Sequence, residues 1–544
     1  MQTKYVVVIG SLLSGIGKGV VTASITKILG MYGYNAMPLK FDGYLNYDCG
    51  TMNPYRHGEV FVLEDGSEVD MDFGEYERFI DRDFNNAFSL TGGKVFSEII
   101  SNERKGKFLG RDVQIIPHVT DFIIDRVEKT AEDNKLEVMV IEVGGTVGDI
   151  ENSYFVEAMR QLALKRKVVF VNTTFVPELE TVGEQKTKPT QIAMRGLMQA
   201  GIQPNFIVCR SKNKLTAETR NKIAYFANLP KEAIIDDHDL ENIYRIPLDF
   251  IRQGFDKLIL SSLELDGGRI NKEELESWDS NSKAINAGND ILNIAIVGKY
   301  MSLHDSYKSV KEAIVHSAAS NNVKVNLNWI ESEELEGEGE GRIKETLGTN
   351  DGIIVPGGFG GRGIEGMINT VRYCRENGVP YLGLCLGMQV MAIEFARNVC
   401  NIEGSNSAEF DKGAENKIIV LMDDQKKVID KGGTMRLGSF PAKIKEGTEA
   451  YKAYGSQLAH ERHRHRYEFN NDYREAFENK GMVVSGTSPD GKLVEMLEWK
   501  GQFGIGTQAH PELKSRLVRP APLFNRFIHE SRSFHLRRKD RDII

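Results

Sequence analysis

The sequence has 544 residues, of which 41% are hydrophobic and 27% are charged. These proportions are those of an ordinary globular protein and exclude a wholly disordered or collagen-like chain. Asp and Glu (77) outnumber Lys and Arg (69), and the resulting net charge of −8 argues against general nucleic-acid binding.

The five cysteines are an odd number and show no CxxC spacing. This pattern argues against both a disulfide framework and a structural zinc site. No stretch approaches the ~20 apolar residues of a membrane span, and the apolar run at residues 5–9 is too short for a signal sequence. We therefore expect a reduced, cytoplasmic protein with neither membrane nor nucleic acid as a partner.

Short β-branched runs alternate with helical patterns along the whole chain. In the first half they predict buried parallel strands at residues 6–9, 138–141, 168–171 and 206–209, with helices such as 21–31 and 156–164 between them. In the second half they predict strands at 294–297, 323–329, 352–355, 381–384 and 504–507. This alternation is typical of doubly wound α/β sheets.

The pattern is interrupted by a segment rich in Gly, Asn, Ser and charge. We interpret residues 267–289 as an interdomain linker. The sequence therefore predicts two doubly wound α/β domains, at residues 1–266 and 290–544.

A glycine-rich loop at residues 10–19 joins the first predicted strand to a helix. Its glycines would let backbone N–H groups approach phosphates, the helix N-terminus favours anions, and Lys18 supplies a cation. The match to GxxxxGK[ST] is imperfect, because Gly19 stands where a magnesium-binding hydroxyl is expected. The loop predicts a phosphate site, and the alternative is a glycine turn with a chance lysine.

Without that hydroxyl, a magnesium ion needs other oxygen ligands. Asp72 lies in an acidic segment, and Glu142 ends a buried strand before Gly144 and Gly145. A carboxylate at the carboxyl end of a parallel strand faces the ligand crevice of such a sheet. We predict that Asp72 and Glu142 form a magnesium pair, although each alone could be an ordinary surface acid.

Two further segments suggest a second anionic ligand. Residues 186–191 place two lysines and two threonines around Pro189, which suits a phosphate chain. Residues 149–151 offer carboxylates and backbone groups that could read a base. For the lysine cluster, a solvated turn is the alternative.

A second constellation surrounds Cys385. This cysteine occupies the nucleophile position of a G-x-nucleophile-x-G turn between a strand and a helix, whose N-terminus would stabilise a thiolate. His510 and Glu512 lie two residues apart, and we expect a neutral His510 to accept the thiol proton while Glu512 orients the ring. The glycine-rich loop at 356–363 and the N–H of Leu386 would form an oxyanion hole. For the other four cysteines a buried structural role is expected.

Together these motifs resemble the CTP synthase family of glutamine-hydrolysing amidotransferases over essentially the whole chain. The resemblance implies a P-loop-like synthetase (amidoligase) domain followed by a class I glutaminase domain. Its motifs lie at residues 14–19, 50–52, 57–61, 64–66, 114–118, 142–151, 186–191, 356–360, 432–438 and 461–467.

The resemblance also implies a role for each matching residue. ATP would contact Gly15, Ile16, Gly17, Lys18, Gly19, Val20, Lys40 and Asp72, and its adenine His238, Asp239 and Leu240. UTP or CTP would contact Ser14, Asp149, Ile150, Glu151, Lys186, Thr187, Lys188, Pro189, Thr190, Gln191 and Lys222. Glutamine would contact Gly358, Leu386, Gly387, Met388, Gln389, Glu409 and Arg466, around the catalytic Cys385, His510 and Glu512.

Three local departures from the family pattern are visible. Gly43 and Cys49 each replace a usual proline, and we expect looser turns near the ATP site from these changes. Residues 177–179 also differ. None of the departures removes a residue that the resemblance assigns to chemistry.

The activity implied is conversion of UTP to CTP with ATP, Mg²⁺ and ammonia from L-glutamine. The resemblance further implies a homotetramer, activation by GTP with Arg362 as a candidate contact, and feedback inhibition by CTP. We also expect ammonia to pass between the two sites along Pro54, His57 and Val60, and the alternative for His57 is a hydrogen-bonded structural histidine. The alternatives are a P-loop amidotransferase that amidates a carboxylate, and a nonenzymatic nucleotide-sensing ATPase or scaffold with a vestigial glutaminase half.

Overall fold

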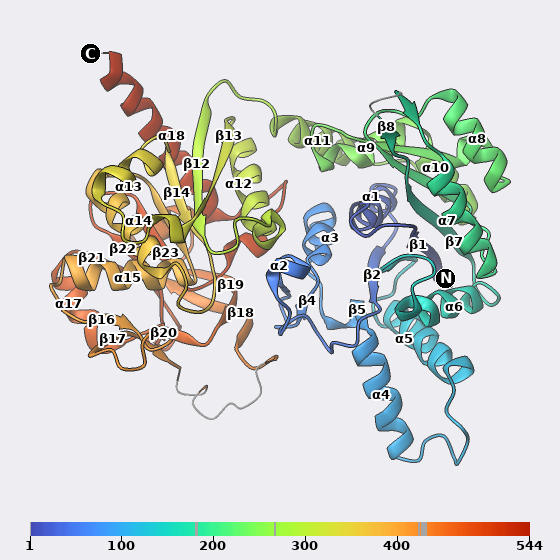
Figure 1. The fold of residues 1–544 in the computed structure, drawn as a ribbon, viewed down its shortest axis with the longest axis horizontal. Coiled ribbons are helices and arrows are strands. Elements are labelled where there is room, and N and C mark those ends of the chain that lie inside the picture. Colours follow the sequence, from blue (N-terminus) through green and yellow to red (C-terminus); the bar gives the residue numbers. More distant parts are fainter. Residues whose placement is uncertain (1, 180–182, 266–267, 423–424, 426–431, 544) are drawn as a thin grey trace. The chain divides into compact units, whose positions relative to one another are not determined.

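The structure, a computed structural model, describes residues 2–179, 183–265, 268–422, 425 and 432–543. Its internal contacts divide the chain into two compact units (Figure 1). The first unit comprises Met1–Asp48 and Glu75–Ser282, and the second comprises Cys49–Gly74 and Lys283–Ile544. The segment 49–74 therefore comes from the N-terminal half of the sequence but packs with the C-terminal half.

The first unit contains a seven-stranded parallel sheet in the order β11-β10-β7-β1-β6-β2-β5. The four strand predictions for this half are confirmed, because each falls inside an observed strand. The strands are β1 (Lys4–Gly10), β2 (Ala36–Asp42), β5 (Ser89–Thr91), β6 (Val138–Val143), β7 (Val168–Phe175), β10 (Phe206–Ser211) and β11 (Ile234–His238). Two short hairpin pairs accompany the sheets: β3 (Phe61–Val62) with β4 (Glu68–Val69), and β8 (Glu178–Leu179) with β9 (Glu184–Gln185).

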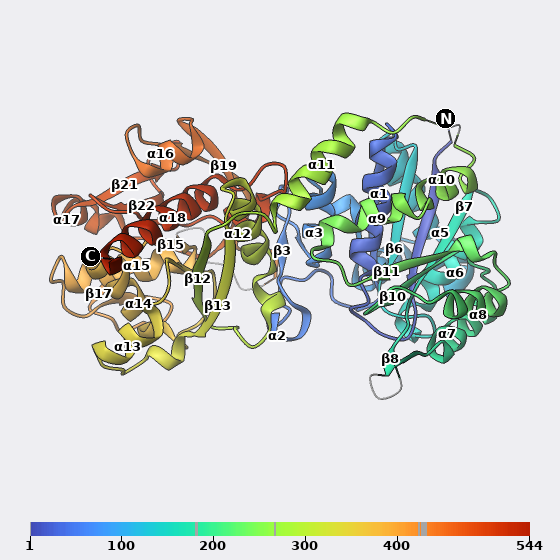
Figure 2. The same ribbon diagram turned by 90° about the horizontal axis from the view of Figure 1, so that it is seen from above.

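Helices cover both faces of this sheet, as right-handed crossovers in opposite directions require. Figure 2 shows α1 and α9 on one side of the strands and α6, α7 and α8 on the other. The helices are α3 (Asp72–Ile80), α4 (Gly92–Arg104), α5 (Thr120–Asp133), α6 (Ser153–Leu162), α7 (Lys188–Gln199), α8 (Ala217–Ala227), α9 (Ile246–Arg252) and α10 (Phe255–Ser262), with α1 at Lys18–Met31.

Most of the predicted linker is a helix that packs on the first unit. In α11 (Lys272–Ala284), Trp278 is buried, and its Nε1 donates to the carbonyl of Tyr244 over 2.8 Å. Arg245 pairs with Asp279 of the same helix at 2.6 Å. The charged composition suggested a linker, and within the first unit this segment is held by the buried Trp278 together with ion pairs such as Arg245–Asp279.

The second unit contains a nine-stranded mixed sheet in the order β13-β12-β14-β15-β23-β22-β21-β18-β19. Its parallel part confirms the five predicted strands: β12 (Ile291–Gly298), β13 (Lys324–Glu331), β14 (Gly352–Val355), β15 (Tyr381–Leu384) and β23 (Gly504–Thr507). An antiparallel part extends it: β22 (Val494–Trp499), β21 (Met482–Thr487), β18 (Arg436–Ile444) and β19 (Leu458–His465). A separate small sheet holds β16 (Ser405–Ser407), β17 (Asn416–Leu421) and β20 (Tyr467–Phe469).

Two apolar cores lie on the two faces of the large sheet. One joins it to α13 (Glu340–Leu347), α14 (Ile364–Asn377) and α15 (Leu386–Asn398), and the other joins it to α12 (Lys308–Ser320) and α18 (Pro522–Ile543). Short helices α2 (Pro54–His57), α16 (Glu449–Tyr454) and α17 (Arg474–Asn479) complete the unit. Both units are therefore α/β sheets covered on both faces, as the sequence predicts.

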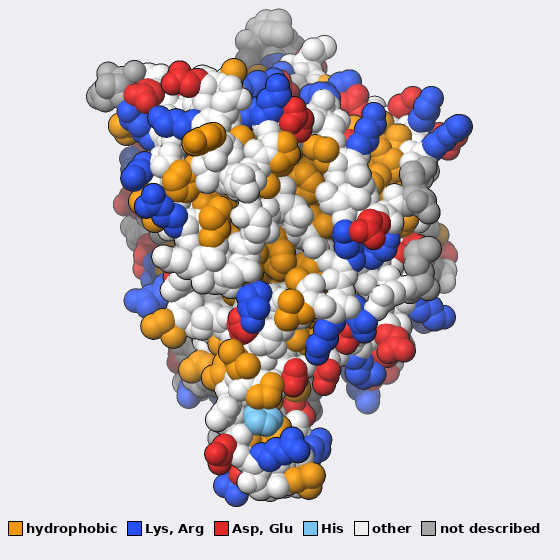
Figure 3. Space-filling view, turned by 90° about the vertical axis from the view of Figure 1, so that its right-hand side faces the viewer, with side chains coloured by type: hydrophobic (Ala, Val, Ile, Leu, Met, Phe, Trp, Pro, Cys, Tyr) orange, Lys and Arg blue, Asp and Glu red, His pale blue; other side chains and the backbone are white. Residues whose placement is uncertain are grey.

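Several apolar side chains remain at the surface of the first unit. Leu109, Ile150 and Tyr225 are the most exposed, at 87%, 84% and 92%. Figure 3 shows one face of this unit, on which apolar side chains lie scattered among charged ones. Within the described part of the chain, no helix combines the length and the apolar character that crossing a membrane requires.

Candidate active site

Cys385 lies at the sharp turn between β15 and α15. Its φ of 50° is in the left-handed region, which is strained for a residue with a side chain and is common at nucleophile turns. The flanking glycines allow this turn: a Cβ on Gly383 would lie 2.6 Å from the Gly387 carbonyl carbon, and one on Gly387 would lie 2.1 Å from the Val355 oxygen. The strand–cysteine–helix arrangement expected from the sequence is thus present.

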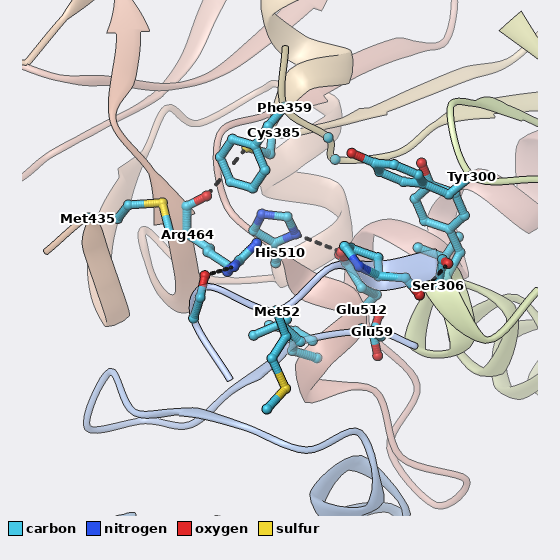
Figure 4. Close-up of a pocket in the computed structure, with 18 of the residues that line it drawn as sticks. Met52, Glu59, Tyr300, Ser306, Phe359, Cys385, Met435, Arg464, His510 and Glu512 are labelled. Atoms are coloured by element: carbon cyan, nitrogen blue, oxygen red, sulfur yellow. Dashed lines mark hydrogen bonds and ion pairs between the residues drawn. The ribbon is translucent and has the colours of Figure 1, made fainter. Parts of the chain in front are cut away.

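His510 and Glu512 lie beside this turn, at the end of β23. His510 Nδ1 is 2.8 Å from Glu512 Oε1, and His510 Nε2 is buried without a hydrogen-bond partner among the described residues. The Cys385 thiol lies 3.4 Å from the Gln508 amide nitrogen and 3.9 Å from the Arg464 carbonyl oxygen. Figure 4 marks the contact of His510 with Glu512 and that of Cys385 with Arg464.

The groups around His510 influence the protonation of its ring. Burial alone would lower the pKa of its imidazole, but the Glu512 carboxylate and Cys385 outweigh burial and raise the pKa to about 10. This direction favours the charged ring, whereas the expectation from the sequence, which stays a prediction, is a neutral ring that accepts the thiol proton. The cause is the close Glu512 carboxylate within a buried site, where opposite charges interact strongly.

A cavity of about 530 Å³ opens onto Cys385 and His510. Gly357, Gly358 and Phe359 of the predicted oxyanion loop line it, and a Cβ on Gly357 would lie 2.7 Å from His510 Cε1. Two predicted glutamine contacts, Glu409 and Arg466, also line it. The structure therefore brings the predicted nucleophile, base, orienting carboxylate and glycine loop together around one cavity.

The remaining predicted glutamine contacts lie in the first turn of α15. These are Leu386, Gly387, Met388 and Gln389. Gln389 Nε2 donates to the Tyr467 carbonyl and to Gln508 Oε1, both over 3.2 Å. Glu409 Oε1 accepts the Gly360 N–H over 2.8 Å, and burial raises the pKa of its carboxyl group.

Several groups at or beside this cavity were not among the predicted site residues. Lys299 is buried, its Nζ donates to the Phe359 carbonyl over 3.2 Å, and burial lowers its pKa to about 8. Residues 50–60 contribute Met52 and Glu59 to the lining, together with Pro54 and Val60, which were predicted only as part of an ammonia passage. Gln508 could have been found from its place two residues before His510, but nothing in the sequence indicates that the segment 49–74 packs here.

The first unit carries the predicted phosphate loop between β1 and α1. Gly15 and Gly17 have φ values of 75° and 83°, which only glycine adopts without strain. Lys18 begins α1 and its Nζ donates to the Gly145 carbonyl over 2.9 Å, so this loop lies against the one after β6. Ser14, Ile16, Gly19 and Val20 belong to the same turn and first helical residues.

Glu142 lies near the carboxyl end of β6, opposite Lys40 of β2 in the parallel register. The carboxylate is almost completely buried; Lys40 Nζ lies 4.0 Å from Oε1, and the Tyr76 hydroxyl donates to Oε2. Asp72 begins α3 and belongs to the second unit by its contacts. Among the described residues, three or more His, Cys, Asp and Glu side chains do not gather in a metal-holding cluster.

The predicted pyrimidine-nucleotide residues lie on the loop after β6 and around α7. Asp149 Oδ2 accepts the Thr146 N–H over 2.7 Å, and Asp149 and Ile150 line a cavity of about 260 Å³ that α7 also borders. Gly43 fits closely here, since a Cβ would lie 2.1 Å from Asn152 Oδ1. This glycine therefore permits close packing, rather than only the looser turn that the sequence suggested.

The rest of this group and the predicted adenine contacts are spread over neighbouring elements. Lys186 Nζ pairs with Glu184 at 2.6 Å, and Gln191 Nε2 donates to Thr187 Oγ1 over 3.1 Å. Lys188, Pro189 and Thr190 form the first turn of α7, and Lys222 lies on α8. His238 ends β11, followed by Asp239, which pairs with Arg210, and Leu240.

Comparison with known families defines the class of this protein. Residues 302–530 match the family model described as glutamine amidotransferase class-I, and residues 4–265 match the one described as CTP synthase N-terminus. The second unit thus carries a class I glutamine amidotransferase domain, and the protein is a glutamine-dependent amidotransferase.

Relatives that are similar over nearly the whole chain identify the family within this class of amidotransferases. A CTP synthase of Caldanaerobacter subterraneus subsp. tengcongensis is 47% identical over 97% of this chain and 98% of its own. One of Pyrococcus furiosus is 47% identical over 98% of both chains. The chain belongs to the CTP synthase family. A solved structure of the Trypanosoma brucei CTPS glutaminase domain with bound acivicin is 36% identical, with a TM-score of 0.42, and covers 44% of this chain and 94% of that one.

Proposed function

We propose that this chain catalyses the reaction ATP + UTP + glutamine + water → ADP + phosphate + CTP + glutamate. The observation that carries the proposal is the arrangement of Cys385, His510 and Glu512 around one cavity, in a chain whose other unit has a phosphate loop. We assign the synthetase reaction to residues 1–266 and glutamine hydrolysis to residues 290–544, joined through residues 267–289.

Glutamine hydrolysis would begin with attack of the Cys385 thiolate on the carboxamide carbon. The N–H groups of Gly358 and Leu386 would stabilise the oxyanion, and Glu409 and Arg466 would hold the amino acid. A charged His510 holds a proton that it can give to the departing ammonia, leaving a thioester on the sulfur. His510 would then accept a proton from the water that hydrolyses this thioester.

UTP amination would begin with transfer of the γ-phosphoryl group of ATP to uracil O4. This oxygen is a poor leaving group, and phosphorylation makes it a good one that ammonia then displaces from C4. Lys18 and Lys40 would neutralise charge on the transferred group. The phosphate loop would hold ATP, with His238 to Leu240 at its adenine, and residues 149–151, 186–191 and Lys222 would hold UTP.

Magnesium fits the donor set that we propose for it. Asp72 and Glu142 supply carboxylate oxygens, which are the hard ligands that this ion prefers. When bound, the ion would polarise the phosphoryl oxygens of ATP. The role of the two carboxylates is to hold it, and that of Lys40, beside Glu142, is to limit charge repulsion at the site.

Regulation and assembly are part of the same proposal. A homotetramer formed through the first unit belongs to this proposal, as the resemblance to the CTP synthase family implies. CTP would inhibit by occupying the UTP site, since the two nucleotides differ only where amination occurs. GTP would activate hydrolysis, with Arg362 as a candidate contact. All five cysteines are free thiols, which suits a reducing cytoplasm.

The proposal is tested with the Cys385→Ala variant. It should lose glutamine-dependent CTP formation but retain the ammonia-dependent reaction, because only thioester formation needs the thiol. Absorbance of the amination product, measured with ATP, UTP and either nitrogen source, separates the two reactions. Absence of CTP from the wild-type protein with ammonia would instead favour a carboxylate-amidating enzyme or a nonenzymatic scaffold.

A further inference from the structure

The β3–β4 hairpin of the segment 49–74 lies directly against β18 and β19 of the same unit. The Ser439 N–H donates to the Glu64 carbonyl over 3.1 Å. Gly66 and Gly438 meet at this contact: a Cβ on Gly438 would lie 2.6 Å from the Gly66 nitrogen. The backbones are therefore as close as two glycines permit, and the hairpin is fixed in register on the sheet edge.

Glu64 of this hairpin neutralises a completely buried arginine. Arg462 Nε donates to Glu64 Oε1 over 2.8 Å, and Arg462 Nη1 donates to the Val62 carbonyl over 3.1 Å. The guanidinium also lies 5.4 Å from the centre of the Phe61 ring. Burial alone would raise the pKa of Glu64, but Arg462 and Lys514 outweigh it and lower the pKa to about 2. Glu64 is thus ionised over the whole neutral range.

The backbone of the same arginine contacts the catalytic histidine. The backbone N–H of His510 donates to the Arg462 carbonyl over 2.7 Å. Lys514, two residues after Glu512, places its Nζ 3.2 Å from Glu64 Oε1. Glu64 therefore contacts side chains of both β19, whose Arg462 carbonyl accepts the backbone N–H of His510, and the short helix Pro511–Lys514 that follows His510.

Glu68 makes an equivalent connection to the nucleophile. Arg464 Nε donates to Glu68 Oε1 over 2.8 Å, and Glu68 is almost completely buried. The Arg464 guanidinium lies 5.1 Å from the ring of Phe359, in the oxyanion loop. The carbonyl of Arg464 is the one that lies 3.9 Å from the Cys385 thiol.

We infer that Glu64 and Glu68 are positioning residues for the glutamine hydrolysis proposed above, because each fixes, through an arginine of β19, the carbonyl that contacts His510 or Cys385. The inference rests on that proposed function. It means that the N-terminal half of the sequence supplies a hairpin on which the geometry of the glutaminase site depends. Removing Glu64 takes away an ionised partner of the buried Arg462, and removing Glu68 takes away an ionised partner of the partly exposed Arg464. Either change is unfavourable for the arginine and should let β19 shift.

Glu64→Gln and Glu68→Gln test the inference, and Asp65→Asn is the matched control on the exposed tip of the same hairpin. We expect kcat for glutamine hydrolysis to fall about tenfold to a hundredfold, because small misplacements of reacting groups have effects of this size. The KM for glutamine should change less than about twofold, since the glutamine contacts are separate groups. Alkylation of Cys385 by a chloromethyl ketone analogue of glutamine should slow in parallel, and Asp65→Asn should behave as wild type.

Two further measurements distinguish a positioning role from a general loss of protein stability. Ammonia-dependent CTP formation and the thermal midpoint should stay close to wild type in at least one of the two Gln variants. The second measurement is a double-mutant cycle of Glu64→Gln with Arg462→Gln. The fold-loss in kcat for glutamine hydrolysis in the double variant should be much smaller than the product of the two single fold-losses, because both changes act through β19.

Wild-type kcat in both Gln variants, or losses that multiply in the cycle, would overturn the inference. A larger rise in KM than fall in kcat would do the same. If instead the wild-type protein hydrolyses glutamine but Cys385→Ala does so equally well, the proposed function fails, and this result is distinct from the others.

Discussion

The charges around His510 determine which groups carry protons in the glutaminase site. Glu512 lies 2.8 Å from the ring and favours its charged form. Glu461 lies nearby, fully buried, and accepts the Tyr454 hydroxyl over 2.8 Å. Burial raises the pKa of Glu461 to about 7, with Lys514 opposing and Glu512 adding to the rise. Partial protonation of Glu461 reduces the like-charge repulsion between this carboxyl group and the carboxylate of Glu512.

Glu512→Gln removes the charge of the carboxylate but keeps the size of the side chain, so it tests the effect of this charge on His510. The amide can still accept from His510, but the charge that raises the pKa of the ring is lost, so this pKa must fall from about 10. We expect kcat for glutamine hydrolysis to drop by about 10²–10⁴, as for removal of a general acid–base component. The falling limb of the pH–rate profile, where His510 loses its proton, should move to lower pH.

Ammonia-dependent CTP formation is the internal control for Glu512→Gln and should remain at the wild-type level. A profile with an unmoved alkaline limb would mean that Glu512 does not set the charge of His510.

At the scale of elements, strands with apolar runs could be predicted and the strand with buried charges could not. β14 and β15 are short, apolar and wholly buried, and β12 is buried from Ile294 to Gly298, so their sequences suffice. In β19, Arg462, His463 and His465 are buried, although the sequence of this strand, taken alone, predicts an exposed polar segment. Its charges are compensated by Glu64, Glu68 and Glu495 from distant parts of the chain, and no local pattern reveals such partners.

The nucleophile turn, by contrast, was predictable because its glycine requirement is local. Gly383 and Gly387 are needed for contacts within a few residues of Cys385 and with the adjacent β14. The same reasoning could not identify Lys299 or Arg464, whose importance arises only when separate elements meet around the cavity. Motif spacing thus predicts the groups that share a turn, and packing determines the rest.

Gly387→Ala should disturb α15 as a whole. Its Cβ would lie 2.1 Å from the Val355 oxygen, a backbone atom, so the helix and β14 must separate. We expect a loss of about 1–3 kcal/mol in the free energy of unfolding, as for overpacked cores, together with reduced glutamine hydrolysis. Thermal unfolding and initial hydrolysis rates measure both effects.

The control for this prediction is Gly341→Ala in the first turn of α13, where a Cβ would meet nothing within 4 Å. This variant should be as stable as wild type or slightly more so, because alanine favours helices. Equal stability of the two alanine variants would show that the close approach at Gly387 does not constrain the fold.

At the scale of the whole molecule, one segment crosses between the two halves of the sequence. Residues 49–74 pack within the second unit but are joined by peptide bonds to the first unit at Asp48 and Glu75. Asp72, a proposed magnesium ligand, lies at the end of this segment, so the segment takes part in both proposed half-reactions. Composition gave no sign of this exchange, since the segment is too short and too mixed to be recognised as an insertion.

Asp72→Asn should therefore affect only one of the two reactions. We expect CTP formation to fall about a hundredfold or more with either glutamine or ammonia, because electrostatic stabilisation of phosphoryl transfer is weakened. Glutamine hydrolysis should persist, since Cys385 and His510 are unchanged. Isothermal titration with magnesium and ATP provides a second measurement, and wild-type CTP formation by the variant would exclude Asp72 as a ligand.

The last prediction concerns how ammonia leaves the glutaminase site. Near neutral pH free ammonia is mostly protonated and cannot attack C4, so a passage that excludes water would preserve the nucleophile. Pro54 and Val60 line the cavity that contains Cys385, whereas His57 is exposed and is not among its lining residues.

Val60→Phe should fill part of this cavity and lower glutamine-dependent CTP formation severalfold more than it lowers glutamine hydrolysis. The control is His57→Ala, because His57 is exposed and lies outside the cavity lining. This variant should change the rates of glutamine hydrolysis and of glutamine-dependent CTP formation by similar factors. Measured glutamate and CTP should thus become uncoupled only in Val60→Phe. If the two products fall together in that variant, ammonia does not pass Val60.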